Sequence, residues 1–427
     1  MSNLFSDLNW RGLVHQTTDE KNFGSWLNEE KRTLYIGFDP TADSLHVGSL
    51  LQLMMLRRYQ QAGHRPIALV GGATGMIGDP SGKSQERNLL SEEALQHNVE
   101  SLKVQMARFL DFESGDNSAI LVNNYDWMGG LSYLHFLRDV GKHFPVNVMM
   151  AKESVKNRLG REDGGLSYTE FSYMLLQAYD FVHLQKEYDC QLQCGGSDQW
   201  GNITAGIDLG RRMGGGQLYG MTCPLLTNSE GAKMGKTEQG TVWLDRTKTS
   251  PYAFYQYWIN VADVDVGRCL RFLTELNQEE IVALDASREN EPYRRESQKR
   301  LAQEMTELVH GKDGLSGALR ATEVFFGAEI NDLSEEELRE IFAEVPSQEL
   351  SKEELSGEGL ELTMAMVEAG LAKSKGEARR IISQGGAYVN NRRVAEQEAR
   401  VTGDHLIAGG TVILRSGKKK YGLLRFV

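Results

Sequence analysis

Residues 34–49 read L-Y-I-G-F-D-P-T-A-D-S-L-H-V-G-S, and this stretch predicts how the fold begins. Its first five residues form an apolar run that predicts a buried strand, which ends at Pro40 because proline cannot donate to a sheet ladder. From Leu45 onward the apolar residues recur at helical spacing. The predicted helix starts at His46, Gly48 and Ser49. Free N–H groups and the helix dipole favour an anion there, although a core histidine beside a packing glycine gives the same short pattern.

A second apolar run, residues 66–70, completes a strand–helix–strand unit. This unit predicts a parallel α/β sheet with ligands at the carboxyl ends of its strands. The run leads into a glycine-rich loop that contains Asp79, placed for a substrate ammonium, and Lys83 and Arg87, suited to a phosphate. Asp79 precedes Pro80, however, and is then also a common turn residue.

Residues 169–180, T-E-F-S-Y-M-L-L-Q-A-Y-D, predict a helix with Thr169 as its N-cap. Tyr173, Gln177 and Asp180 fall on one face of this helix. Polar side chains within an apolar helix are costly to bury unpaired, so the stripe predicts either a polar ligand or an internal hydrogen-bond network.

Residues 189–194 predict another strand, which runs into Gly195 and Gly196. We expect Ser197 to cap a following helix over residues 198–213. Because glycines permit close backbone approach, this second strand–glycine–helix start is a candidate site for a nucleotide sugar or base.

A short strand is predicted at residues 224–227, before the basic segment K-M-G-K-T at 233–237. Lys233 and Lys236, followed by Thr237, would place two cations on one mobile loop, although any exposed basic turn has the same pattern. The upstream glycine pattern of a P-loop is missing, which argues against Walker-type phosphate binding.

Composition fits a soluble globular protein of about three domains, because 40% of the 427 residues are hydrophobic and 25% are charged. No stretch is long and apolar enough to span a bilayer, and residues 1–10 lack an export pattern. The four cysteines form no C-x-x-C pair. We therefore expect a reduced, cytoplasmic protein with no membrane association and no metal site.

The net charge of −12 is unevenly distributed. Residues 332–361 contain 11 acids and 2 bases, whereas residues 371–427 contain 12 bases and 4 acids. This pattern predicts a poorly packed acidic linker before a basic module that binds an anionic partner such as nucleic acid. The basic residues suited to a phosphate backbone are Lys373, Lys375, Arg379 and Arg380. A solvated basic surface without a partner is the alternative.

The motifs together carry a specific resemblance over essentially the whole chain. D-P-T-A-D-S-L-H-V-G-S with K-M-G-K-T resembles the paired signatures of class I aminoacyl-tRNA synthetases. Y-I-G-F-D-P-T-A-D-S-L-H, A-L-V-G-G-A-T-G-M-I-G-D-P-S-G-K, F-S-Y-M-L-L-Q-A-Y-D-F and G-G-S-D-Q-W-G-N-I-T resemble the bacterial tyrosyl-tRNA synthetases in particular. The resemblance implies a Rossmann-like catalytic domain at 1–242, a helical anticodon-contacting domain at 243–345, an acidic linker at 346–360 and an RNA-binding module of the S-four type, a small α+β fold, at 361–427.

The resemblance also implies residue roles. Tyrosine would be bound by Tyr35, Asp79, Tyr173, Gln177 and Asp180. ATP or the adenylate would be bound by Gly37, Asp39, His46, Gly48, Gly196, Asp198, Gln199 and Lys236. The phosphates in the transition state would be stabilised by Thr41, His46, Lys83, Arg87, Lys233, Lys236 and Thr237. Two positions depart from the family pattern: Ile36 replaces a cysteine that touches the ribose, and Ser49 replaces the second histidine of H-x-G-H.

The implied function is tyrosine–tRNA ligation. Tyrosine is activated with ATP, which Mg²⁺ accompanies, to tyrosyl-adenylate and pyrophosphate; the tyrosine then passes to the 3′-terminal adenosine of tRNA(Tyr). No tightly bound cofactor is expected, and the family implies a homodimer. Two rival readings remain. A tryptophanyl-tRNA synthetase is disfavoured by the Tyr35–Asp180 pair. An inactive RNA-binding relative is disfavoured because the chain retains Lys233, Lys236, Asp79 and Asp180.

Overall fold

The structure is a computed structural model of the chain, and it describes residues 3–81, 90–152, 155–156, 159, 165–237, 240–328, 330, 333–342, 345–418 and 420–427. Lys83 and Arg87 lie outside the described residues. The chain divides into two compact units, Met1–Thr249 with Tyr257–Val309, and Ser250–Gln256 with His310–Val427. Residues 257–309, which the resemblance assigns to a separate helical domain, therefore group with the catalytic part. Among the described residues, no helix is long and apolar enough to cross a membrane.

The first unit is built on a sheet of six strands in the order β1-β6-β5-β2-β3-β4. Strand β1 is antiparallel to β6, and the other neighbours are parallel. The strands are β1 (Gln16–Thr17), β2 (Thr33–Phe38), β3 (Arg65–Val70), β4 (Ile120–Asn123), β5 (Cys190–Gly196) and β6 (Tyr219–Cys223). The predicted strands at 34–38, 66–70 and 189–194 are thus confirmed. The predicted strand at 224–227 is wrong, since only Thr227 forms an isolated bridge, with Lys233.

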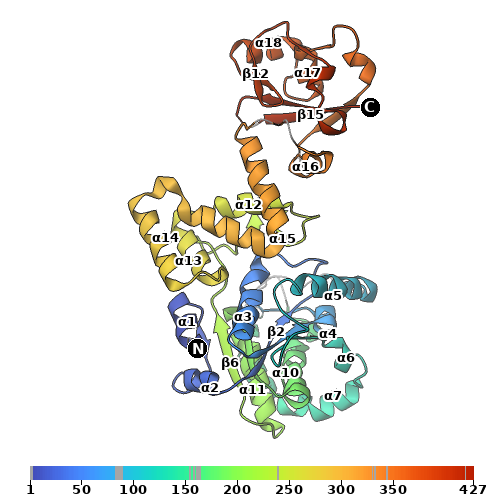
Figure 1. Cartoon of the computed structure of the whole chain (residues 1–427). Helices are drawn as coiled ribbons and strands as arrows, with labels where there is room; N and C mark the ends of the chain where they lie inside the picture. The colour runs from blue at the N-terminus through green and yellow to red at the C-terminus, as the bar shows by residue number, and fades with distance from the viewer. Residues whose placement is uncertain are drawn as a thin grey trace. The chain divides into compact units, whose positions relative to one another are not determined.

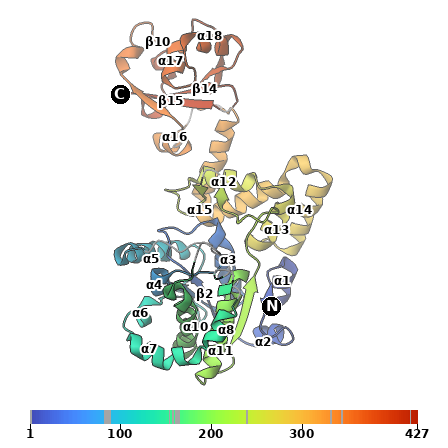
Figure 2. The ribbon, with the colours of Figure 1, turned by 180° about the vertical axis from the view of Figure 1, so that it is seen from behind.

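Helices cover both faces of this sheet (Figures 1 and 2). On the face that carries Tyr35, α10 packs through Phe181, and α11 lies beside α10. On the opposite face lies α3, whose Tyr59 contacts Met221 of β6 and Cys194 of β5. The helices of this unit include α1 (Leu4–Arg11), α2 (Phe23–Glu29), α3 (Leu50–Gln61), α4 (Gly72–Ile77), α5 (Glu92–Met106), α6 (Tyr125–Met128), α7 (Tyr133–Asp139), α8 (Val146–Met150), α10 (Tyr168–Tyr188), α11 (Trp200–Arg212), α13 (Asp263–Leu273) and α14 (Gln278–Asn290).

Three helix starts differ from the sequence prediction. The N-cap of α10 is Ser167, whose side chain accepts from the Glu170 N–H, so Thr169 lies inside the helix. Ser197 opens a 3₁₀ turn, Ser197–Gln199, instead of capping α11 with its side chain. The glycine-rich segment after β3 is partly helical, because α4 occupies Gly72–Ile77.

The second unit contains a five-stranded sheet in the order β12-β11-β14-β15-β9, in which only the β15–β9 pair is parallel. Its strands are β9 (Ser347–Leu350), β11 (Ala387–Val389), β12 (Arg392–Val394), β14 (Thr411–Ser416) and β15 (Lys420–Phe426), and β10 (Leu360–Glu361) pairs with β13 (Arg400–Val401). One face of the sheet buries α17 (Leu362–Glu368) and α18 (Lys375–Ser383) in a shared core. Helices α12 (Pro251–Ile259) and α15 (Glu296–Phe325) have residues in both units.

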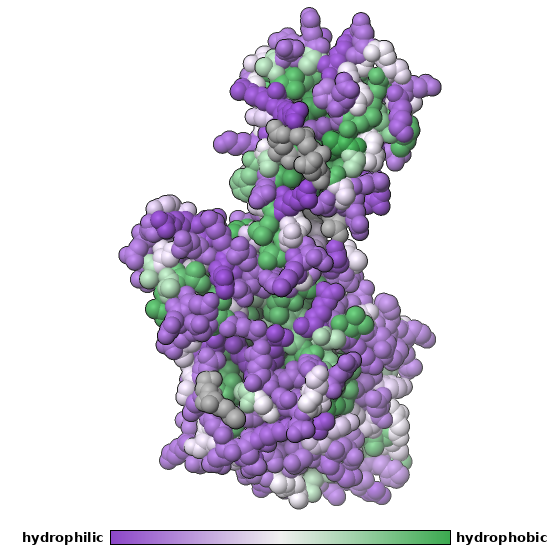
Figure 3. Space-filling view, in the orientation of Figure 1, coloured by the Kyte–Doolittle hydropathy of each residue, from purple (hydrophilic) through white to green (hydrophobic). Residues whose placement is uncertain are grey.

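The expectation of a poorly packed acidic linker is wrong. Leu333, together with Ile341 and Phe342 in and beside α16 (Glu335–Ile341), is buried against Val324 of α15 and Tyr421 of β15. Ser347–Leu350, within the predicted linker at 346–360, forms β9 of the sheet. Acidic residues gather on the exposed face of α16, while the apolar residues between them face the core, so the charge count concealed an amphipathic helix. Hydrophilic residues cover most of the face of the molecule seen in Figure 3.

Candidate active site

The strand order places a ligand crevice between β2 and β5. From β2 the chain proceeds through β3 to β4 on one side, while β5 and β6 lie on the other, so the order reverses at the β2–β5 pair. In open α/β sheets such a switch point, at the carboxyl ends of the strands, is where ligands bind. The predicted site segments follow the carboxyl ends of β2, β3 and β5, at 39–49, 71–81 and 197–199.

The turn after β2 holds His46 as the N-cap of a 3₁₀ turn, Val47–Ser49. The His46 Nδ1 atom accepts from the Gly48 N–H at 2.9 Å. Burial and the nearby Lys236 and Lys233 lower the pKa of His46, so the ring is neutral at neutral pH and carries its proton on Nε2. A Cβ on Gly48 would lie 2.6 Å from the imidazole, so a larger residue there would displace the ring. The result is a neutral hydrogen-bond donor held at the start of the helical segment that follows β2.

Helix α5 and the segment that follows the two lysines hold this turn in place. Asn98 donates to the Pro40 carbonyl at 2.9 Å, and the Gln105 Oε1 atom accepts from the Leu45 N–H at 2.9 Å. The Val47 N–H donates to the Val242 carbonyl at 3.0 Å. Backbone and side-chain bonds from two distant segments therefore fix the approach to His46.

One end of the crevice is a buried phenolic and carboxylic pair. Tyr35 and Asp180 are both 1% exposed. Asp180 accepts from Trp127 Nε1 at 2.9 Å and from Asn124 Nδ2 at 3.1 Å, while the Tyr35 hydroxyl has no hydrogen-bond partner among the described residues. Beside Tyr35, in register on β5, lies Gln193, whose buried Oε1 also lacks such a partner. Unpaired buried polar atoms are rare, so these two groups point to a polar ligand.

Burial dominates the ionisation of this pair. It raises the pKa of Asp180 to about 8, against the lowering effect of the bonds from Asn124 and Trp127. Burial and the Asp180 charge also raise the pKa of Tyr35 well above its ordinary value. Both groups are consequently able to stay neutral at physiological pH and to exchange hydrogen bonds with a hydroxyl.

A hydrogen-bond network forms the next part of the crevice. Gln199 Nε2 donates to Asp79 Oδ2 at 2.7 Å, and Gln199 Oε1 accepts from Gln177 Nε2 at 3.2 Å. Asn202 Nδ2 also donates to Gln199 Oε1, at 3.2 Å. The other oxygen of Asp79 accepts from the Ser81 N–H. A carboxylate with amide neighbours is suited to an ammonium group, and Gln177 of the polar stripe on α10 joins this hydrogen-bond network.

The lysine segment lies against the His46 turn. Gly235 has φ +87°, and a Cβ there would lie 2.8 Å from Val47 Cβ and 3.2 Å from the Gly48 nitrogen. Lys236 is exposed, and Lys233 Nζ lies 3.6 Å from Asp198 Oδ2. Burial raises the pKa of Asp198, and Lys233 opposes that shift. Two lysines therefore border the crevice within reach of the His46 turn.

Most of the predicted site residues that the structure describes lie at the carboxyl ends of the strands of the six-stranded sheet. Asp79, Gln177 and Gln199 are joined by hydrogen bonds, and Tyr173 is buried on the same helix face. A Cβ on Gly196 would lie 2.9 Å from Asp198, and one on Gly71 equally close to Asp39. Gly37 and Thr41 are exposed at the end of β2 and beyond it. Lys83, Arg87 and the side chain of Thr237 lie outside what the structure describes.

Sequence reasoning missed Asn124, Trp127 and Gln193. The first two follow β4 in the segment N-N-Y-D-W, so an apolar run ending in asparagines was the available signal. Asn124 also donates to Thr74 at 3.0 Å, and Trp127 stacks on His183 with ring centroids 4.3 Å apart. These contacts orient the donors that face Asp180.

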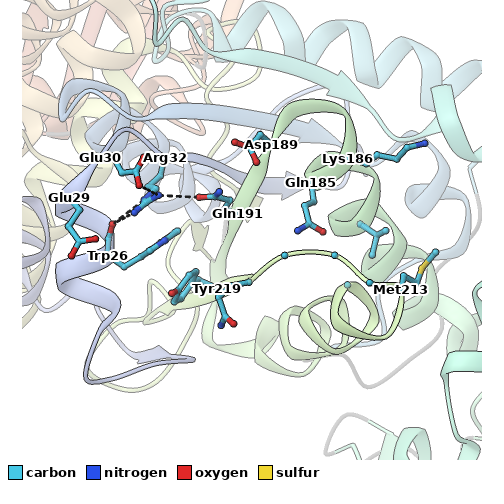
Figure 4. Close-up of a pocket in the computed structure, with 16 residues that line it drawn as sticks. Trp26, Glu29, Glu30, Arg32, Gln185, Lys186, Asp189, Gln191, Met213 and Tyr219 are labelled. Atoms are coloured by element: carbon cyan, nitrogen blue, oxygen red, sulfur yellow. Dashed lines mark hydrogen bonds and ion pairs between the residues drawn. The ribbon is translucent and has the colours of Figure 1, made fainter.

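Neither a metal cluster nor the cavity drawn in Figure 4 marks this site. Among the described residues, no group of three or more His, Cys, Asp or Glu side chains is placed to hold a metal ion. A cavity of about 850 Å³ opens at the other, amino ends of β2, β5 and β6 (Figure 4). There the rings of Trp26 and Tyr219 stack with their centroids 3.9 Å apart, and Arg32 donates hydrogen bonds to the Trp26 carbonyl and to Gln191. That cavity has no contact with the crevice residues.

In the second unit, the four predicted RNA-binding side chains are all exposed on α18 and the turn before it: Lys373, Lys375, Arg379 and Arg380. Lys375 pairs with Glu361 at 3.0 Å, and both partners are nearly half exposed. An exposed pair of this kind contributes little, so Lys375 is free to exchange it for a phosphate.

Known proteins resemble this chain over nearly its full length. A family described as tRNA synthetases class I (W and Y) matches residues 27–327, and a tyrosine–tRNA ligase SYY-like C-terminal domain matches residues 337–424. The tyrosine–tRNA ligase of Rhodopirellula baltica is 62% identical over 99% of this chain and 96% of its own length, and that of Roseiflexus castenholzii is 52% identical over the full length of both.

Solved structures extend the likeness. A truncated mitochondrial tyrosyl-tRNA synthetase from Aspergillus nidulans is 31% identical, with a TM-score of 0.68 over 76% of this chain and 94% of that one. A tryptophanyl-tRNA synthetase from Encephalitozoon cuniculi shares the fold at 14% identity, with a TM-score of 0.53 over 74% of this chain and 89% of that one. The chain therefore belongs to the tyrosine–tRNA ligases, class I aminoacyl-tRNA synthetases that activate tyrosine with ATP and transfer it to tRNA.

Proposed function

We propose that the crevice selects tyrosine by its two polar ends. Tyr35 and Asp180 bond the phenolic hydroxyl, while Asp79, Tyr173 and Gln177 hold the ammonium. The single observation that carries this assignment is the buried Tyr35 hydroxyl without a described partner, beside Asp180. A phenol placed between them satisfies a group that is costly to leave unpaired.

The second part of the proposal concerns ATP. Gly37, Asp39, Gly48, Gly196, Asp198 and Gln199 line the nucleotide, with Mg²⁺ entering as part of the ATP substrate. The tyrosine carboxylate attacks the α-phosphorus, the bond to the bridging oxygen breaks, and pyrophosphate leaves. A ribose hydroxyl at the tRNA 3′ end then attacks the adenylate carbonyl, and AMP leaves.

Charge stabilisation by positioned donors accounts for the rate of the first step. Thr41, His46, Lys233, Lys236 and Thr237 are the proposed donors, together with Lys83 and Arg87 from the part of the chain that the structure does not describe. The Nε2–H of neutral His46 and the exposed lysines on a glycine-containing segment support this role. Such donors accelerate the step when they bind the departing pyrophosphate more tightly than ground-state ATP.

Pyrophosphate exchange with tyrosine, phenylalanine and tryptophan tests the amino-acid assignment. Tyr35→Phe should reduce the preference for tyrosine over phenylalanine by about tenfold, because it removes one partner of the hydroxyl. Tyr59→Phe is the matched control, since Tyr59 is also fully buried but lies on the opposite face of the sheet. An unchanged preference in Tyr35→Phe would reject the assignment.

We further propose that the second unit binds tRNA through Lys373, Lys375, Arg379 and Arg380, and that the helices of residues 243–345 contact the anticodon. The net positive charge of residues 371–427 and the exposure of these four side chains support phosphate contacts. Replacing all four by alanine should raise KM for tRNA at low salt and leave pyrophosphate exchange intact.

The salt series provides the control for this test. The difference in KM between wild type and the four-alanine variant should shrink as salt rises, because phosphate contacts release counterions. A Lys21→Ala/Lys186→Ala variant removes two exposed lysines of the first unit and should leave KM unchanged. Equal KM values at low salt would reject the RNA-binding role. Truncation near Gly357 is a poorer test, because it removes Tyr421 and Leu423 from a buried core.

A homodimer is also proposed. Large apolar side chains are unusually exposed on α7, α8 and the start of α10: Tyr133 at 62%, Leu134 at 74%, Val146 at 63% and Tyr168 at 62%. Clustered exposed apolar groups mark association surfaces, and a self-complementary patch gives a two-fold dimer. Leu134→Glu should shift sedimentation toward the monomer, whereas Val264→Glu, at another exposed valine, should not.

A cytoplasmic location is proposed as well. It is supported by four free cysteines, all of them buried, with the pKa of each raised by burial. Such thiols are stable in a reducing compartment.

A further inference from the structure

Side chains of α12 and α13 hold the lysine loop, defined here as residues 228–237, through hydrogen bonds. The Gly235 N–H donates to the Tyr257 hydroxyl at 2.9 Å. From α13, Arg268 donates to the carbonyl of Thr227, the residue just before the loop, and Asp265 accepts from the Ser229 hydroxyl at 3.3 Å. The bond from Gly235 is the one that lies between the two lysines.

Gly235 is a point where the loop has little freedom. Its φ of +87° is accessible to glycine, and its backbone packs directly on Val47 and Gly48. The Met234 N–H donates to Leu226, and the Val242 N–H donates to the Gly235 carbonyl, both at 2.9 Å. Met234 is buried with its sulfur 3.7 Å from Cys269. The residue before Lys236 is thus fixed on both sides, with Tyr257 as its side-chain partner.

Tyr257 is suited to this contact. Burial raises its pKa to about 12, so the hydroxyl is uncharged at neutral pH and accepts from the Gly235 N–H through a lone pair. Its ring lies against Trp258 with centroids 5.0 Å apart, so the hydroxyl is held by a packed side chain.

We propose that Tyr257 is a positioning residue that orders the lysine loop for adenylate formation. The inference rests on the proposed role of Lys236 in stabilising phosphate charge. Without the hydroxyl, the Gly235 N–H loses its partner and the loop must be ordered during each turnover, which lowers the rate of the chemical step. Tyrosine binds to the network around Asp79 and Tyr35, which Tyr257 does not touch, so its affinity is unaffected.

Single-turnover adenylate formation with Tyr257→Phe tests this role, because only one oxygen is removed. The rate should fall about fivefold, as expected for loss of one hydrogen bond, with the Kd for tyrosine unchanged. Tyr255→Phe on the same helix is the matched control, since its hydroxyl makes no hydrogen bond to a described residue. Thermal unfolding of each variant verifies that it is folded.

The double variant separates positioning from a general structural effect. If Tyr257 acts through Lys236, Tyr257→Phe should cause less than about a twofold further loss in a Lys236→Ala background. A full fivefold loss in that background, an unchanged rate in the single variant, or weaker tyrosine binding would overturn the inference. If Lys236→Ala alone has no effect, the proposed role of the lysine fails instead, so the two failures are distinguishable.

Discussion

The proposed tyrosine pocket and the lysine loop are built in opposite ways. In the pocket, Tyr35 and Asp180 are buried, and Asn124 and Trp127 both donate hydrogen bonds to Asp180. In the loop, Lys233 and Lys236 are exposed, and the structure fixes the backbone between them. A buried, preorganised pocket provides selectivity through unpaired polar groups, whereas an exposed cation on a fixed backbone is able to follow charge as it develops. The comparison predicts that the two regions affect different kinetic constants.

The largest expected effect is on the loop side. Lys236→Ala should slow adenylate formation by about 2.7–4 kcal/mol, the typical loss for one donor to a developing charge, with little change in tyrosine affinity. Single-turnover kinetics measures both quantities. Lys186→Ala, which removes another exposed lysine of the same unit, should have no effect. An unchanged rate combined with weaker tyrosine binding would erase the contrast between the regions.

An intermediate effect is expected on the pocket side. Asp180→Asn should lower the ratio of kcat/KM for tyrosine to that for phenylalanine by about tenfold or more, because the hydroxyl loses a carboxyl partner in a desolvated site. The phenylalanine rate itself should change much less. Competition between the two amino acids in pyrophosphate exchange gives the ratio directly. If both rates fell in parallel, Asp180 would have a structural role and the pocket would not be the selective region.

A third effect concerns stability. In the folded protein the pKa of the Asp180 carboxyl is about 8, against an ordinary value of 3.8. The carboxyl therefore keeps its proton at pH values at which it would be ionised in the unfolded chain. The native state therefore binds more protons than the unfolded state between these values, and the free energy of unfolding falls as pH rises from about 4 to 8. Asp180→Asn removes this titration, so its stability should fall less steeply. Urea unfolding across this range compares the slopes, and parallel slopes would contradict the raised pKa.

Local patterns were enough to predict several elements of the site. The strands at 34–38 and 66–70 and the helix that carries Tyr173, Gln177 and Asp180 follow from apolar runs and from helical periodicity. The cap positions were predicted less well: Ser167 and not Thr169 caps α10, because serine and threonine compete when they lie two residues apart. The acidic stretch was misread because a count of charges ignores which face of a helix the apolar residues occupy.

The sequence by itself determined the strands, the polar stripe of α10 and the motifs that identify the family, since each depends on residues close together in the chain. Only the tertiary structure decided that Asn124, 56 positions from Asp180, is its partner, and that Gln193 lies in register with Tyr35. It also decided that Tyr257 meets Gly235. These contacts depend on strand order and helix packing, which bring distant segments together through burial that no local pattern encodes.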